Sequence, residues 1–130
     1  MRLELKIETQ LITWNEVAGF CWSKDSNRYA RTKKRQQAFI KHEITGQLPE
    51  VKNFFGNKPV RVIYEWHTSG SFDLGNLAAG EKFIADSFNE LKLWDDDSTT
   101  KEIIHRYLQD ECDFCAVTIQ TMRPPKKEGN

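Results

Sequence analysis

Residues 60–94 read VRVIYEWHTSGSFDLGNLAAGEKFIADSFNELKLW and contain the two clearest secondary-structure patterns of the chain. Residues 60–67 are rich in β-branched and aromatic side chains, which predicts a strand. Apolar or small residues then recur at spacings of three and four, which predicts an amphipathic helix of about four turns. They are Leu77, Gly80, Ile84, Phe88 and Leu91. The stretch therefore predicts a strand, a Ser- and Gly-containing link and a helix that packs against a sheet.

The rest of the chain supplies one more helix and further strands. Residues 2–12 alternate apolar and polar side chains, and residues 114–122 are mostly apolar, so both predict strands. A polar, basic segment after Ser26 or Asn27 predicts a helix to about Ile44, which Gly46 should end. Residues 13–25, 53–58 and 95–99 read as loops, whereas residues 103–108 fit a strand or a helical turn equally well. We expect an α+β fold, with a mixed β-sheet packed against two α-helices.

Length and composition favour a single folded domain. The chain has 130 residues, 38% of them hydrophobic, and we assign residues 1–122 to the domain and 123–130 to a flexible basic tail. No apolar run approaches the roughly 20 residues of a membrane span, and no secretory signal begins the chain. The three cysteines form no disulfide framework, and one CxxC (Cys112, Cys115) with scattered histidines favours buried thiols over zinc. We expect a cytoplasmic protein without a membrane partner.

The formal net charge is zero, but the charges are unevenly distributed. Residues 20–45 contain seven Lys or Arg against two acidic residues, and residues 81–113 contain ten Asp or Glu against four basic ones. A solvated helix face explains the basic run as well as a binding surface does.

Acidic residues are the remaining candidates for chemistry, because no phosphate-binding, dinucleotide-binding or serine-hydrolase motif is present. Asp73 precedes the predicted helix, Asp95, Asp96 and Asp97 follow it, and Glu65 lies on the strand before it. If the neighbouring strands brought the two flanking loops together, these carboxylates could hold Mg²⁺, with Lys82 neutralising charge on a phosphate. The alternative is that Asp73 only favours the helix dipole and the others are solvated.

The same residues resemble a known family. Asp73-Leu74-Gly75-Asn76-Leu77, then Lys82, then Trp94-Asp95-Asp96-Asp97-Ser98 is similar to the signature of RusA-type Holliday junction resolvases of phages and prophages. That signature is Asp-Leu-Asp-Asn-(Leu/Ile), a helix carrying a lysine, and Asp-Asp before a small residue. Upstream, Trp14-Asn15-Glu16 and the basic segment from Asn27 to Lys34 resemble that family's Asn-containing loop and first helix.

The resemblance implies a RusA-like fold and a homodimeric, Mg²⁺-dependent endonuclease, with Mn²⁺ as an alternative cofactor, which nicks four-way DNA junctions. By position, Asp73 and Asp97 would be metal ligands, Asp96 the alternative to Asp97, and Lys82 the catalytic lysine. Basic residues of the first helix would contact DNA phosphates. They are Arg28, Arg31, Lys33, Lys34 and Arg35.

One position departs from the family signature. Gly75 stands where the second aspartate of Asp-Leu-Asp is expected, and glycine has no side-chain ligand atom. The resemblance therefore implies impaired metal binding and catalysis, unless Glu65, Asp95 or a water takes over. The alternative function is a catalytically inactive module of the same fold that binds DNA or inhibits a host protein.

Overall fold

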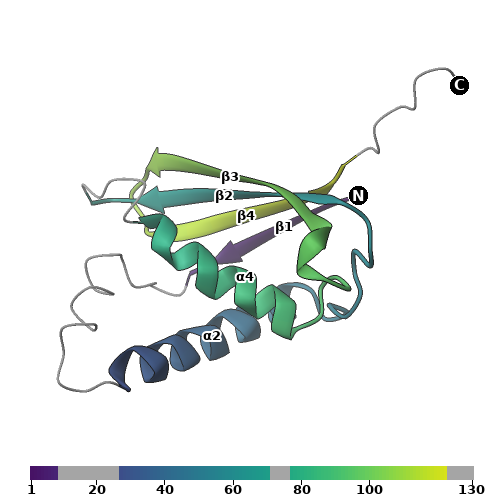
Figure 1. Cartoon of the computed structure of the whole chain (residues 1–130). Helices are drawn as coiled ribbons and strands as arrows, with labels where there is room; N and C mark the ends of the chain where they lie inside the picture. The colour runs from purple at the N-terminus through teal and green to yellow at the C-terminus, as the bar shows by residue number, and fades with distance from the viewer. Residues whose placement is uncertain (9–26, 71–76, 123–130) are drawn as a thin grey trace, which may run out of the picture.

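The computed structural model describes residues 1–8, 27–70 and 77–122. These residues form four strands and two α-helices, with two short 3₁₀ helices (Figure 1). In chain order the elements are β1 (Arg2–Ile7), α2 (Arg28–Gln47), β2 (Val60–Thr68), η1 (Ala78–Gly80), α4 (Glu81–Glu90), η2 (Asp97–Thr99), β3 (Thr100–Gln109) and β4 (Phe114–Thr121). The expected α+β fold, with a mixed sheet and two helices in a single small domain, is confirmed.

The sheet has the strand order β1-β4-β2-β3. β2 and β3 are parallel, and α4 forms the crossover between them, whereas β4 is antiparallel to both of its neighbours, β1 and β2. Tyr64 pairs with His105 on one side and with Val117 on the other, so β2 is an inner strand. β3 is an edge strand, with no partner on its outer side among the described residues.

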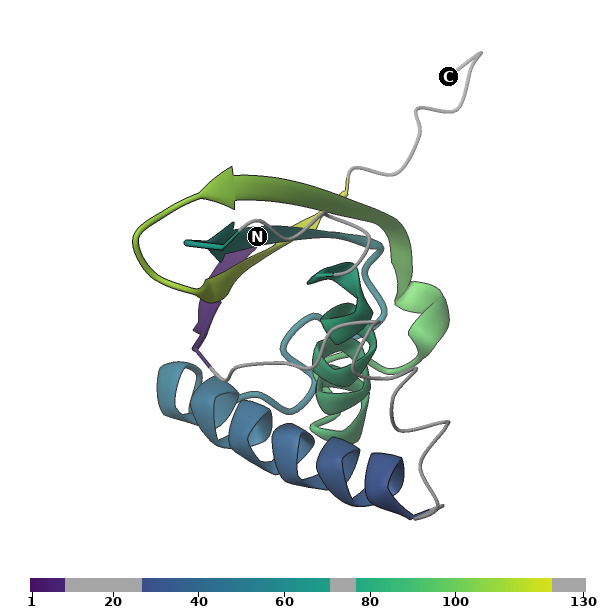
Figure 2. The same ribbon diagram turned by 90° about the vertical axis from the view of Figure 1, so that its left-hand side faces the viewer.

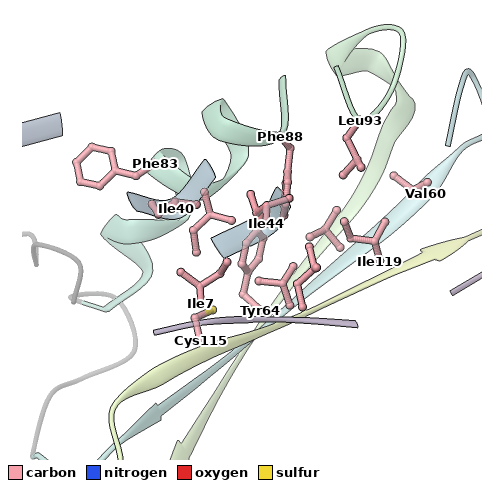
Figure 3. Packing of buried hydrophobic residues seen from close by; sticks show 14 of the residues in the cluster. Ile7, Ile40, Ile44, Val60, Tyr64, Phe83, Phe88, Leu93, Cys115 and Ile119 are labelled. Carbon is pink, nitrogen blue, oxygen red and sulfur yellow. The ribbon is translucent and has the colours of Figure 1, made fainter. Parts of the chain in front are cut away.

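Both helices lie on the same side of the sheet (Figure 2). The core fills the space between them and one sheet face, where Ile44 and Phe88 from the helices meet Tyr64 and Ile119 from the strands (Figure 3). Each of these four side chains is buried. Burial of a large apolar side chain stabilises the fold by about 1.5–3 kcal/mol.

The other sheet face has no helix over it among the described residues. Side chains alternate along β2, so Tyr64 and Trp66 point into the core while Glu65 and His67 point to this open face. His67 stacks on Phe114 with ring centroids 4.1 Å apart, and its Nδ1 lies 2.9 Å from Asp110 Oδ2. The hydrogen bond from His67 lowers the pKa of Asp110 below its ordinary value.

The structure defines the extent of three elements more closely than the sequence does. Gly46 does not end the basic helix, because α2 runs to Gln47 and Leu48 N still donates to Ile44 O at 2.8 Å. A glycine costs a helix only about 1 kcal/mol, whereas Pro49 has no N–H to continue it. β1 ends at Ile7, and residues 9–12 of the predicted strand lie outside the described part. The ambiguous residues 103–108 belong to strand β3.

None of the described helices is long and apolar enough to cross a membrane.

Candidate functional site

Lys82 lies in the first turn of α4 and is exposed. One turn later on the same helix, Asp86 Oδ2 lies 3.1 Å from Lys33 Nζ of α2. Lys41 Nζ and Glu90 Oε2 make a second link between the two helices, at 2.6 Å. These ion pairs and the buried contacts beneath them fix α4 against α2, so the position of Lys82 is set by the helix layer.

The acidic segment after α4 is held by backbone and side-chain hydrogen bonds. Trp94 is buried and its indole Nε1 donates to Asn89 Oδ1 at 2.8 Å, which ties the segment to the last turn of α4. Asp95 N donates to Gly56 O at 2.9 Å, and Asp96 Oδ1 accepts from Ser98 N at 2.9 Å. Asp95 and Asp96 are exposed, and Asp97 begins η2. The turn therefore presents the carboxylates of Asp95 and Asp96 to solvent.

Asp73 and Gly75, the first half of the expected metal site, lie outside the described residues. The described residues on either side, Gly70 and Leu77, are placed at the end of the sheet where β2 ends. Gly70 O accepts from Tyr107 Oη at 3.1 Å, near the end of β3, and Leu77 directly precedes the helical turn that leads into α4.

The two ends of α4 lie at opposite ends of the sheet. Thr100, directly after η2, pairs with Val60 at the start of β2, whereas Thr68 at its end pairs with Gln109 (Figure 1). At about 3.3 Å per residue these ends of β2 are roughly 26 Å apart. Lys82 and Asp96 accordingly lie at opposite ends of α4. A parallel crossover carries the chain back along the whole sheet. The expectation that the two flanking loops come together stays a prediction, because residues 71–76 lie outside the described part.

Of the expected metal ligands, Asp73 and the side chain of Asp97 lie outside the described part, so the ligand set stays a prediction. No group of three His, Cys, Asp or Glu residues in that part is arranged to hold a metal ion. Glu65, considered as a replacement for the carboxylate missing at Gly75, lies on the open face, away from α4 and Lys82. Asp95 and Asp96 are exposed and lie just before η2. Their carboxylate oxygens are ligands of the kind that Mg²⁺ binds.

Glu81 lines a cavity of about 150 Å³ between α4 and the β2–β3 pair. The sequence analysis did not select this acidic residue. Burial raises the pKa of Glu81, the charge of Asp86 raises it further, and Lys82 partly offsets both. Tyr64, fully buried, lines the same cavity, and burial raises its pKa well above 10. The signal was available: Glu81 lies four residues after Leu77 and three before Ile84, on the apolar stripe of the helix.

The raised pKa of Glu81 predicts a pH-dependent stability. The carboxyl group of Glu81 keeps its proton to a higher pH in the folded chain than in the unfolded chain. The free energy of unfolding therefore falls as the pH rises from 4.5 through the raised pKa. We expect Glu81→Gln to melt at a higher temperature than wild type at pH 7, with the difference vanishing below about pH 4. Thermal denaturation followed by circular dichroism across this range measures it. The matched control is Glu50→Gln, at an exposed carboxylate; an equal shift in both variants would contradict the prediction.

The basic residues expected to contact DNA lie in the first half of α2. Arg28, Arg31, Lys34 and Arg35 are exposed, whereas Lys33 is half-buried in its ion pair with Asp86. Lys33 is therefore directed toward α4, and Lys34 and Arg35 are the clearest exposed cations of the segment. Farther along the chain, Cys112 is exposed and Cys115 is buried, both as free thiols. Burial raises the pKa of Cys115, which makes that thiol a poor nucleophile.

Comparison of the chain with protein-family models and with curated proteins gave no match.

Proposed function

We propose that the protein is a RusA-like, structure-specific endonuclease that binds four-way DNA junctions as a homodimer, with catalysis impaired by Gly75. The observation that carries this proposal is the placement of the signature on the fold. Its described parts, Lys82 and Trp94–Ser98, lie on and directly after the crossover helix of a β2–α4–β3 unit. Lys82, Asp95 and Asp96 are all exposed, as residues that meet a DNA backbone must be.

The assigned chemistry is metal-assisted hydrolysis of a phosphodiester. Carboxylates of Asp73, Asp97 and Asp96 would hold Mg²⁺ or Mn²⁺, which supplies an activated water and stabilises the leaving oxygen. Lys82 would neutralise charge that develops on the phosphate. Gly75 removes one carboxylate from this set, so metal affinity and turnover should be low.

The exposed half of α2 is the proposed phosphate-contacting surface. Lys34 and Arg35 are exposed on α2, which lies on the same side of the sheet as α4, the helix that carries Lys82 (Figure 2). A dimer doubles this positive surface on one DNA, which offsets the zero net charge of the single chain.

Binding to synthetic four-way junctions tests this proposal without requiring turnover. We expect tighter binding to a junction than to linear duplex of the same length, and an affinity that falls steeply with salt. Lys34→Ala/Arg35→Ala should weaken junction binding at low salt and reduce the slope of log K against log salt by about 0.9 per lost contact. Lys52→Ala/Lys58→Ala, which removes two exposed lysines in the connection before β2, is the matched control. Equal affinity for junction and duplex would overturn the junction assignment.

A non-enzymatic module is the second candidate, and Gly75 is the observation that favours it. The fold would then be retained while its surface binds DNA or inhibits a host protein, with the acidic residues of 81–113 resembling DNA to a basic partner. Titration with Mg²⁺ and Mn²⁺ by calorimetry separates the two functions, because only the nuclease needs a metal site. Detectable metal binding that Asp96→Asn/Asp97→Asn abolishes would support the nuclease.

A further inference from the structure

The cavity between α4 and the β2–β3 pair runs along the helix. Glu81, Ala85 and Asn89 recur four residues apart, so one face of α4 lines it from end to end. Tyr64 of β2 and Ile103 of β3 line it from the sheet. The Cα atoms of Glu81 and Asn89 are about 12 Å apart at the helical rise, whereas the volume of 150 Å³ equals only about five water molecules. The cavity is therefore long and narrow.

Two polar groups of this cavity have no partner among the described residues. Tyr64 is 1% exposed, and its Oη makes no hydrogen bond in that part of the chain. Only one side-chain nitrogen or oxygen there is both enclosed and unpaired, and it is Gln37 Nε2. Tyr64 Oη is therefore not enclosed by protein, and the space that Tyr64 lines is this cavity. The carboxylate of Glu81 likewise makes no hydrogen bond or ion pair with a described residue, since Asp86 and Lys82 act on it through charge alone.

The two unpaired groups lie near each other, because the charge of Glu81 raises the pKa of Tyr64. Most buried polar groups in folded proteins have a hydrogen-bond partner, and a carboxylate in apolar surroundings is costly without one. A ligand that donates hydrogen bonds to both oxygens would supply what the described residues do not.

The lining of the cavity restricts the chemistry of such a ligand. One carboxylate favours a cation, but a single carboxylate is a poor site for a metal ion, which takes several oxygen ligands. The rest of the lining is mostly apolar, with Ala85 and Ile103 along the cavity and the indole of Trp94 near Asn89. An ammonium group that carries a hydrocarbon chain matches both parts, because it has three N–H donors at one end and apolar surface at the other.

We propose that this cavity binds a linear primary alkylammonium ion of about four to six carbons. The ammonium lies between Glu81 and Tyr64 Oη, and the chain extends along Ala85 and Ile103 toward Trp94. Ile103 is 50% exposed and Glu81 is half-buried, so the ligand enters from solvent between α4 and β3. This site does not depend on the proposed nuclease function.

Titration of the full chain with butylammonium chloride, followed by ¹H–¹⁵N NMR, tests the site. The indole N–H signal of Trp94, identified with Trp94→Phe, should shift with a Kd of roughly 0.1–1 mM. 1-Butanol has the same chain without the charge and should bind roughly 10- to 100-fold more weakly, and butyrate should not bind. From ethylammonium to butylammonium the affinity should rise about fourfold for each methylene. Equal affinities for butanol and butylammonium would overturn the assignment of a cation site.

Two variants separate the charge from the shape of the cavity. Glu81→Gln should fold, because it removes a charge that burial disfavours, and it should weaken butylammonium binding by roughly 10- to 100-fold while leaving butanol binding unchanged. Glu50→Gln, at an exposed carboxylate, is the matched control. Ala85→Leu fills the cavity without changing a charge and should abolish binding of both compounds. Wild-type affinity for butylammonium in Glu81→Gln or in Ala85→Leu would overturn the proposal.

The pH dependence of the affinity identifies the charged partner. Glu81 must be ionised to pair with an ammonium, and burial and Asp86 raise its pKa while Lys82 partly offsets them. From the sheet, Tyr64 is the titratable group that faces it, and His105 stacks on Tyr64 with ring centroids 5.2 Å apart. An alkylammonium keeps its charge below about pH 10, as lysine does. The affinity should therefore rise at least about fourfold from pH 4 to pH 8, and Glu81→Gln should lose most of this rise. A wild-type affinity that is the same at both pH values would contradict pairing with Glu81.

Discussion

Phe88→Ala should destabilise the fold by about 3–5 kcal/mol, the range for deleting a fully buried aromatic side chain. Phe88 is 0% exposed and its ring lies edge-on to Trp94, with centroids 5.7 Å apart. The substitution leaves a cavity between α4, the sheet and the turn that carries Asp95 and Asp96, and it removes the contact that holds Trp94. A domain of this size has a total stability of about 5–15 kcal/mol, so the variant should be close to unfolding at 37 °C.

Urea denaturation followed by tryptophan fluorescence and circular dichroism measures the change. The midpoint should fall while the slope with urea concentration stays the same, because the surface exposed on unfolding is nearly unchanged. Phe39→Ala is the matched control: the same side chain is removed from α2, where it is 57% exposed, and the change should stay within about 0.5 kcal/mol. Similar losses in both variants would mean that α4 does not pack on the sheet as described.

Local side-chain patterns were sufficient to predict most of the fold. The β-branched run of β2 and the apolar run of β4 both form strands, and the three-and-four spacing from Leu77 forms a 3₁₀ turn followed by α4. β3 was ambiguous for a physical reason. An edge strand is solvated on its outer side, and the adjacent Ile103 and Ile104 interrupt the simple alternation of a half-buried strand.

The site was harder to predict than the fold, because it depends on contacts between residues distant in the chain. Spacing along the sequence places Lys82 on a helix between acidic segments. It does not predict the parallel pairing of β2 with β3, which sets the ends of the sheet at which that helix begins and ends. The ion pair of Lys33 with Asp86 is likewise a contact between two helices, and it removes one cation from the surface that the sequence predicts. The position of Glu81 on the apolar stripe of α4 can be read from the sequence, but the cavity that it lines with Tyr64 depends on how α4 packs on the sheet.

Gly75→Asp should raise Mg²⁺-dependent nicking of a four-way junction by at least about 10- to 100-fold, the range lost when even an outer partner of a metal ligand is removed. The substitution restores the carboxylate that the Asp-Leu-Asp signature has and this chain lacks at Gly75. A third carboxylate raises the affinity for a hard divalent cation and fixes its position relative to the scissile phosphate. Nicking of a labelled synthetic junction, assayed with Mg²⁺ and with Mn²⁺ beside wild type, measures the gain.

Two matched variants show whether such a gain comes from metal binding. Gly75→Asn adds a side chain of the same size without the negative charge, so its gain should be far smaller than that of Gly75→Asp. Asp73→Asn in the Gly75→Asp background should abolish the gained activity while leaving junction affinity at low salt unchanged, because phosphate contacts supply that affinity. If Gly75→Asp binds Mg²⁺ more tightly but nicks no faster, the scaffold no longer positions the phosphate. The inactive DNA-binding module would then be the better description of this protein.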